Sequence, residues 1–253
     1  MVEPKPMLHF VSSHTDARSA SMHASPHPPV LRAFEDLAPG LAALGTTHRT
    51  SRGDMLSPAR TSSTLRVVTE GVACLSDSTS NLCVAMVQKD IPLGRMSPGT
   101  WLTDGALTEV PFQSIIETYG AEVAMAVCTR AADLSRTVVE TELVCAIRHE
   151  ASQRLARWMQ PLLAQEQTVT LTQIKLAQLA GLQRTSVCAA MATLQHAGAL
   201  KVTRGRIRLQ DYGVLRGQAC GCGSGVLAAP PESEEPAPYA RSHSEHEVRR
   251  QAG

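Results

Sequence analysis

Basic side chains are concentrated in one stretch of this chain, residues 171–216. That stretch holds seven Lys and Arg residues against one acidic residue, Asp211, whereas the formal net charge of all 253 residues is only +1. Arginine guanidinium groups bind phosphate oxygens through paired hydrogen bonds, and each neutralised phosphate releases condensed counterions. The pattern therefore predicts a surface that binds a phosphate-rich polyanion.

Two short helices joined by a glycine turn are predicted at the start of this stretch. Thr172 can cap the first helix, and Gly181 is the residue type that ends a helix in the left-handed conformation. A second helix begins near Arg184, with one buried face because apolar residues recur at i, i+3, i+4 and i+7. The apolar residues are Val187, Ala190, Met191 and Leu194. This is the form of a helix-turn-helix, whose second helix lies in the DNA major groove.

A basic two-stranded wing is predicted after the second helix. The candidate strands are Leu200–Thr203 and Arg206–Leu209, and Arg204-Gly205 between them fits a tight turn. Asp211 can cap a short closing helix that runs to Arg216. Helices, wing and charge together favour a winged helix-turn-helix over an ordinary helical hairpin with a solvated basic face.

The stretch resembles the DNA-binding domain of the Crp/Fnr family of bacterial transcription regulators. The matching residues are Leu171, Thr172, Leu176, Ala177, Gly181, Arg184, Ser186, Val187, Leu194, Gly198 and Arg204-Gly205-Arg206-Ile207. The resemblance implies that Arg184 grips guanine, with Thr185 and Ala189 at positions where some members carry Glu and Arg. The expected DNA-contacting residues are Thr172, Gln183, Arg184, Thr185, Ser186, Cys188, Ala189, Arg204 and Arg206. Few of them are polar readers of bases, which implies an operator unlike that of other members.

The resemblance extends to an N-terminal sensor domain. Residues 52–56 and 65–72 resemble the opening of the cyclic-nucleotide-type β-roll, and residues 82–87 are a further strand candidate. A plain antiparallel β-domain is the alternative. Members that bind cyclic nucleotide have an arginine for the phosphate; here the corresponding stretch is Thr103–Leu107 followed by Phe112-Gln113-Ser114. A neutral amide cannot replace a guanidinium against a phosphate. We therefore expect no cyclic-nucleotide effector, no cofactor, and a shortened roll.

One long helix is predicted between the two domains, at residues 124–147. Residues along it recur at steps of 4, 3, 4, 3 and 4, a narrow seam that is typical of a two-helix coiled contact. The expected homodimer interface consists of Val127, Ala131, Leu134, Val138, Thr141 and Cys145. The alternative is a helix packed on its own β-domain, which usually shows a wider apolar stripe. A dimer would place two recognition helices in successive major grooves about 34 Å apart.

The seven cysteines follow no disulfide framework, and most lie in apolar runs where a free thiol behaves as a small core residue. Cys220 and Cys222 form a C-x-C pair beside the C-terminal tail, which makes them weak candidates for a thiol or metal switch. Two ligands alone make no complete metal site, so no metal is predicted. No cysteine precedes Cys74, so the N-terminal cysteines of cluster-binding family members are missing.

The expected organisation is an α+β chain of five segments. These are a disordered tail at 1–29, a degenerate antiparallel β-roll at 30–123, the dimerisation helix at 124–147, the winged helix-turn-helix at 148–218 and a disordered tail at 219–253. The start lacks an apolar region long enough for a signal peptide, and no run spans a membrane, so we expect a cytoplasmic protein.

The expected function is a homodimeric regulator that binds double-stranded DNA, with RNA polymerase as a candidate further partner. The alternative is an interaction or thiol-sensing protein that keeps this fold but has lost operator recognition, which Thr185 and Ala189 would favour. The sequence shows no nucleophile–base constellation and no phosphate loop, so we do not expect an enzyme.

Overall fold

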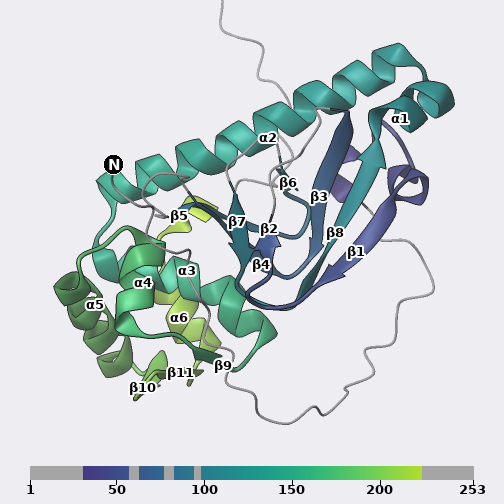
Figure 1. The fold of residues 1–253 in the computed structure, drawn as a ribbon. Helices are drawn as coiled ribbons and strands as arrows, with labels where there is room; N and C mark the ends of the chain where they lie inside the picture. The colour runs from purple at the N-terminus through teal and green to yellow at the C-terminus, as the bar shows by residue number, and fades with distance from the viewer. Residues whose placement is uncertain (1–30, 57–62, 77–82, 94–97, 224–253) are drawn as a thin grey trace, which may run out of the picture.

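The computed structural model describes residues 31–56, 63–76, 83–93 and 98–223, which form a β-roll, a long helix and a helical C-terminal domain with a small sheet (Figure 1). Both predicted tails lie outside the described residues, apart from 219–223. No described helix is long and apolar enough to cross a membrane. The predicted α+β class is confirmed.

The roll consists of two four-stranded antiparallel sheets that face each other. One sheet has the order β1-β8-β3-β6, with β1 at Thr46–Thr50, β8 at Gly105–Pro111, β3 at Thr64–Glu70 and β6 at Pro92–Leu93. The other has the order β2-β7-β4-β5, with β2 at Met55–Leu56, β7 at Gly99–Trp101, β4 at Val72–Ser76 and β5 at Cys83–Gln88. Two 3-10 turns, η1 at Arg32–Phe34 and η2 at Leu41–Leu44, precede β1. Most neighbouring strands in these sheets, such as β1 and β8, are distant in the sequence, so the register of the strands is set by non-local pairing.

Trp101 fills the space between the two sheets. Its side chain is 1% exposed and packs in a core with Leu56, Leu75 and Leu107. Gly105 makes room for the indole, because a Cβ there would lie 2.4 Å from Trp101 Cζ3 and 2.6 Å from the carbonyl oxygen of Glu70. The centre of the roll is therefore packed with side chains, as in the core of a small barrel.

Two helices follow the last strand. α1 spans Phe112–Tyr119, and Gly120 joins it to α2, which spans Ala121–Arg148. The prediction of one long helix at 124–147 is confirmed. The short stretch after Ile115 is the rest of α1, so the chain passes from the roll to α2 without another strand.

The structure corrects the interpretation of the seam on α2. The apolar seam faces the roll of its own chain, because Val127 and Ala131 pack beside Phe34 and Ile115, and Val138 packs in the core around Trp101. Ser135, on the same face, donates a hydrogen bond from Oγ to the carbonyl oxygen of Pro92 at 3.0 Å. Of the six predicted interface residues, Val127, Ala131, Val138 and Cys145 are buried within one chain, and Leu134 and Thr141 are half-buried. A narrow stripe is thus sufficient to seat this helix on its own sheet, and the buried residues of the seam are already covered within one chain.

The C-terminal domain has the predicted winged-helix elements and one more strand. Its elements are α3 at Ala151–Gln165, β9 at Thr168–Thr170, α4 at Gln173–Ala180, α5 at Arg184–His196, β10 at Leu200–Thr203, β11 at Arg206–Leu209, α6 at Tyr212–Gln218 and η3 at Gly221–Gly223. The wing is three-stranded, in the order β10-β11-β9, rather than two-stranded. β9 is only three residues long, and Val169 pairs with Ile207 to bury both side chains. This run alternates between polar and apolar residues, but three residues are too few for a strand to be recognised in the sequence.

The roll and the winged-helix domain share one apolar core. Val72 and Leu102 of the roll pack in the same cluster as Leu162 of α3 and Val169 of β9. Arg52 of the roll also forms an ion pair with Glu166 at the end of α3. The two domains are therefore in direct contact as well as being joined by α2.

The junction of α2 and α3 contains a second ion pair. Arg157 of α3 pairs with Glu142 of α2, and the two side chains are only 11% and 14% exposed. Trp158 Nε1 donates a hydrogen bond to Glu142 Oε2 at 3.3 Å. A largely buried carboxylate held by two donors fixes the angle between these helices.

Candidate DNA interface and a cysteine–histidine cluster

The N-terminal half of α5 is exposed along one face. The side chains of Arg184, Thr185 and Ala189 are exposed, whereas Val187 and Ala190 are buried in the domain core. Gln183 is the N-cap residue, and its side chain is also exposed. The helix therefore presents its only arginine where a docked duplex could reach it.

The wing lies beside this helix and carries exposed arginines. Arg204 and Arg206 are exposed, and Gly205 between them has a φ of 73°, a conformation that glycine adopts without strain. Gln195 of α5 accepts a hydrogen bond at Oε1 from the Val202 N–H at 2.9 Å, which ties the wing to the helix. The basic turn is thus held in a fixed place next to α5.

Other predicted DNA contacts have structural roles. Thr172 caps α4, since its Oγ1 accepts a hydrogen bond from the Lys175 N–H at 3.2 Å. Cys188 is half-buried, and its Sγ donates a hydrogen bond to Gln173 Oε1 at 3.0 Å. Ser186 is half-buried as well. The Cys188 geometry favours a role in joining α4 to α5 over contact with DNA.

Gln113 does not lie at the position that the family resemblance implies for it. It lies in the first turn of α1, after the last strand of the roll, and its side chain is exposed. Its Nε2 donates a hydrogen bond to Glu117 Oε1 at 2.8 Å. The stretch Thr103–Leu107 is the turn between β7 and β8 and the start of β8. Gln113 therefore cannot line the interior of the roll, and its assignment to a phosphate-binding position is wrong.

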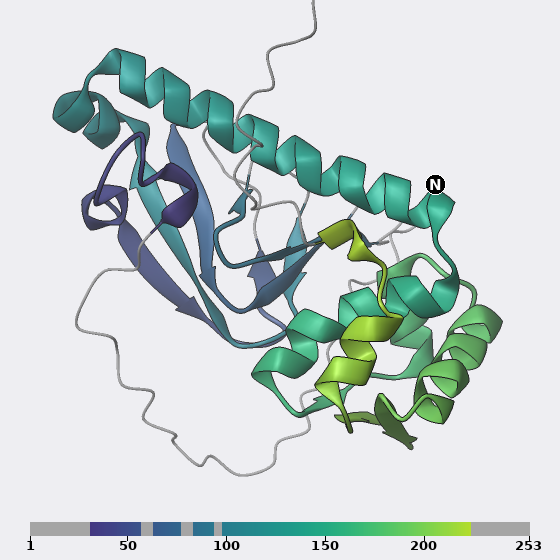
Figure 2. The ribbon, with the colours of Figure 1, turned by 180° about the vertical axis from the view of Figure 1, so that it is seen from behind.

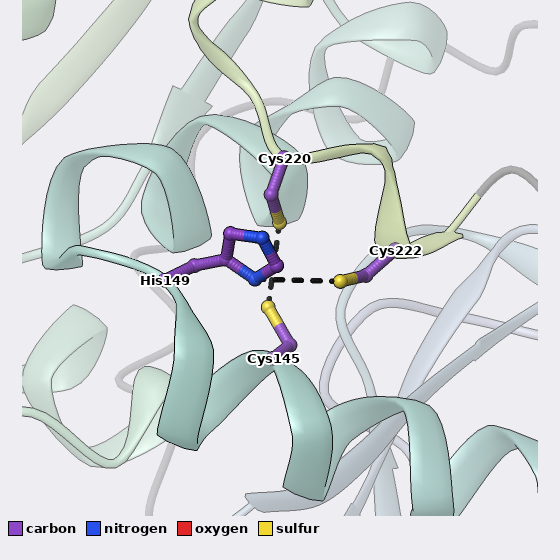
Figure 3. A group of neighbouring side chains, drawn as sticks. All are labelled: Cys145, His149, Cys220 and Cys222. Atoms are coloured by element: carbon purple, nitrogen blue, oxygen red, sulfur yellow. Dashed lines mark hydrogen bonds between the residues drawn. The ribbon is translucent and has the colours of Figure 1, made fainter.

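Four potential metal ligands meet where α2 ends (Figure 3). Cys145 and His149 come from the end of α2, and Cys220 and Cys222 from the segment after α6. The ligand atoms all lie within 4.8 Å of one another. The sequence singled out Cys220 and Cys222 but gave them no further ligands, and it assigned Cys145 to a dimer seam. A Cys and a His four residues apart at a helix end was the signal that could have pointed to the other half.

The environment of this cluster favours neutral thiols in the absence of a cation. Burial is the main cause that raises the pKa of the Cys145 thiol to about 12. Burial also raises the pKa of Cys222, and the neighbouring Cys220 acts in the same direction. Arg157 opposes both shifts, because its positive charge stabilises nearby sulfur anions. All seven cysteines are free.

The C-terminal domain matches a known protein family. Residues 153–217 match the family model of the Crp-like helix-turn-helix domain, which covers α3 to α6 almost completely. Comparison with curated protein sequences gave no significant match.

Solved structures share the fold of the described chain. A CRP-family transcriptional regulator from Thermus thermophilus is 18% identical with a TM-score of 0.52, over 72% of this chain and 100% of that chain. A protein assigned to the Crp/Fnr family from Eubacterium rectale is 17% identical with a TM-score of 0.53, over 74% and 93%. FixK2 from Bradyrhizobium japonicum is 15% identical with a TM-score of 0.50, over 70% and 98%.

The family match and the fold agree with the arrangement of the elements. The matched domain contains the exposed helix and the basic wing, and the shared fold adds the roll and the long helix that precede them. Residues 153–217 therefore form a Crp-like helix-turn-helix domain, and the described chain shares its fold with solved structures of CRP-family and Crp/Fnr-family regulators.

Proposed function

We propose that this protein acts as a homodimeric transcription regulator that binds a palindromic operator with two copies of α5. The observation that carries the proposal is the exposed face of α5, with Arg184 at its start, beside a wing whose arginines are also exposed. The N-terminal residues of a recognition helix contact base edges in the major groove, and basic groups around it bind phosphates.

Arg184 is the proposed base-reading residue. An arginine can donate two hydrogen bonds to one guanine, which contributes about 1–3 kcal/mol of discrimination. Thr185 and Ala189, on the same exposed face, offer one hydroxyl and one methyl group. Arg204 and Arg206 are assigned to phosphates, together with Gln183, Thr172 and Ser186 at the helix starts. Specificity therefore rests mainly on one arginine in each half-site.

The proposed dimer interface is the exposed face of α2, opposite the seam that packs on the roll. Met125, Leu143 and Ile147 are 67%, 60% and 75% exposed, although they are large apolar side chains. Ala132 is exposed and Val139 is half-buried. Met125, Ala132 and Val139 recur at the heptad step of seven, and Leu143 and Ile147 continue this helix face at steps of four, although Val139 also packs in part against the core of its own roll. A second copy of the same helix would bury them.

DNA binding can be tested by fluorescence anisotropy with genomic fragments that the full-length protein selects. We expect Arg184→Ala to lower the affinity for a selected fragment by roughly 5- to 150-fold, the factor that corresponds to one guanine contact of about 1–3 kcal/mol. Arg49→Ala, which removes an exposed arginine from the roll, is the charge-matched control and should leave the affinity unchanged. Equal affinity of Arg184→Ala and wild type, or no binding even at low salt, would contradict the proposal.

Dimerisation can be tested by sedimentation velocity. We expect wild type to sediment as a dimer and Ile147→Glu or Leu143→Glu to sediment as a monomer, because a carboxylate in a coiled-coil seam remains unpaired and loses water. Ile174→Glu is the matched control, since Ile174 is 56% exposed but lies on α4. A wild-type monomer, or dimers of unchanged stability in both α2 variants, would disprove this interface.

We also infer that cyclic nucleotide is not the effector. The inference is supported by the buried indole of Trp101, which occupies the space between the sheets, and does not depend on Gln113. A ligand there would have to displace the largest buried side chain of the roll. Isothermal titration of the full-length protein with cAMP and with cGMP should therefore give no binding heat, and saturable binding of either one would overturn the inference.

A further inference from the structure

We propose that Cys145, His149, Cys220 and Cys222 form a mononuclear Zn²⁺ site that clamps the end of α2 to the end of the winged-helix domain. The role as a clamp rests on the proposed function, in which α2 joins the two protomers and the winged helix binds DNA. The metal site itself rests on the geometry of the four ligand atoms.

The distances between ligand atoms lie within a few tenths of an ångström of those in a tetrahedral site. Zn²⁺ binds cysteine sulfur at about 2.3 Å and histidine nitrogen at about 2.0–2.1 Å, so in a tetrahedral site two sulfurs lie about 3.8 Å apart and a sulfur and a nitrogen about 3.5 Å apart. Cys145 Sγ and Cys220 Sγ are 3.4 Å apart, and Cys222 Sγ and His149 Nδ1 are also 3.4 Å apart. All four ligand atoms lie within 4.8 Å of one another, and they point toward a common centre (Figure 3).

The backbone brings these ligands together from two distant parts of the chain. Cys145 is fully buried on the last turns of α2, and His149 is the residue at which that helix ends. After α6 the chain runs back to α2, where η3 carries Cys222 and the preceding Cys220 is 8% exposed (Figure 2). The Cys220 N–H donates a hydrogen bond to the Gln153 carbonyl oxygen at 3.4 Å. The site is thus built from fixed elements.

The ligand set, three cysteine thiolates and one histidine imidazole, indicates which class of metal ion binds here. Soft sulfur ligands with one histidine in a tetrahedral arrangement are typical of structural Zn²⁺ sites, whose four positions are all filled by protein. An iron–sulfur cluster would hold its protein sulfurs farther apart, because iron and sulfide ions lie between them. Magnesium and calcium prefer oxygen ligands. We therefore assign a closed Zn²⁺ site.

A disulfide explains the cluster less well. The Cys145 and Cys220 sulfurs are 3.4 Å apart, whereas a disulfide bond is about 2.05 Å long. A Cys145–Cys220 bond would also leave a third thiol and an imidazole at the same place with no role. The metal uses all four groups.

The charge balance is supplied by a neighbouring residue. Binding of Zn²⁺ displaces one proton from each of the three thiols to solvent, so the ligand set and the metal together carry one negative charge. The guanidinium of Arg157 acts favourably on the Cys145 and Cys222 sulfurs. Arg157 is itself held in place by Glu142 of α2. Groups that orient and balance the metal ligands are a regular part of metal sites.

The site can be tested by metal titration of the full-length protein, purified with reductant and stripped with a chelator. Zn²⁺ in competition with a chromophoric chelator should bind at one equivalent per chain. Co²⁺ should give the visible bands of a tetrahedral thiolate site. We expect Cys222→Ser and His149→Gln, both at partly exposed positions, to weaken Zn²⁺ binding by more than about 100-fold, since even the loss of a group that only orients a ligand costs roughly 10–100-fold.

Cys128→Ser is the control, because Cys128 is an exposed thiol on α2 outside the cluster. It should bind Zn²⁺ as wild type does, and circular dichroism should show that all variants are folded. If wild type bound Zn²⁺ no more tightly than Cys222→Ser does, the proposed site would be overturned. A Cys145–Cys220 disulfide in a chain that takes up no Zn²⁺ would overturn it as well.

DNA binding of the loaded and the stripped protein separates the two proposals. We expect the stripped protein to lose at least tenfold in affinity for a selected fragment, because its winged helices are no longer fixed relative to the dimer helix. Tight Zn²⁺ binding with equal DNA affinity would overturn the clamp. Arg184→Ala should bind Zn²⁺ normally, so failure of the DNA proposal would leave the metal result interpretable.

Discussion

In the winged-helix domain, helices begin and end at residues that satisfy their own free backbone groups, whereas the roll is held by contacts between distant strands. Thr172 and Asp211 cap α4 and α6 with their side chains, and Gly181 ends α4 at a φ of 59°. In the roll, β3 pairs with β8, and both sheets pack on Trp101. The helices of the winged-helix domain therefore depend on interactions between neighbouring residues, whereas the roll depends on packing between strands that are distant in the sequence.

The chain offers a direct way to observe the two regions separately. It contains two tryptophans, Trp101 in the roll and Trp158 on α3. In a Trp158→Phe background fluorescence reports the roll, and in a Trp101→Phe background it reports the winged-helix domain. Shared packing of Val72 and Leu102 with α3 predicts that the two regions unfold together.

The largest effect is expected from removing the centre of the roll. Trp101→Ala should lower the free energy of unfolding by about 3–5 kcal/mol, because it leaves a cavity between the sheets. The measurement is urea unfolding followed by Trp158 fluorescence and by far-ultraviolet circular dichroism. Both probes should shift to lower urea if the shared core couples the regions. If the unfolding transition reported by Trp158 did not change, the winged-helix domain would be stable by itself and the two regions would not be coupled.

A smaller effect is expected at the junction of the two regions. Glu142→Ala leaves the largely buried guanidinium of Arg157 without its carboxylate and Trp158 Nε1 without its acceptor. We expect a loss of about 2–3 kcal/mol, somewhat below the range for fully buried pairs because both side chains retain some contact with water. The control is Glu140→Ala, since Glu140 is exposed and pairs with Arg136 at 3.8 Å; it should cost less than about 0.5 kcal/mol. Equal stabilities of the two variants would show that the pair does not hold the junction.

What could be predicted from the sequence follows the same division. The caps Thr172 and Asp211, the glycine turn and the start of α5 at Arg184 were all predicted, because each depends on neighbours within one helical turn. The strand β9 and the face of α2 that meets the roll were not, because only the tertiary pairing determines them. The seam of Val127, Ala131 and Val138 has the spacing of a coiled coil, and spacing alone does not say which surface covers it.

The metal-ligand cluster shows most clearly what could not be predicted from the sequence. Cys220 and Cys222 are adjacent enough in sequence to attract notice, but Cys145 and His149 lie at the end of another helix. Only the return of the chain after α6 brings the two halves within 4.8 Å. Sites whose ligands come from one segment can be predicted from spacing, and sites that join two segments require the fold.

The smallest effect should come from a local cap in the winged-helix domain. Asp211 Oδ1 accepts a hydrogen bond from the Val214 N–H at 2.9 Å, so Asp211→Ala should cost about 1 kcal/mol by exposing the first turn of α6. Asp211→Asn keeps an acceptor at the cap and should differ from wild type by no more than about a few tenths of a kcal/mol. The measurement is urea unfolding of both variants, followed by Trp158. α6 precedes Cys220, so the alanine variant should also weaken Zn²⁺ binding more than the asparagine variant does. If the two variants were equally stable, the hydrogen bond at the cap would not be what holds α6.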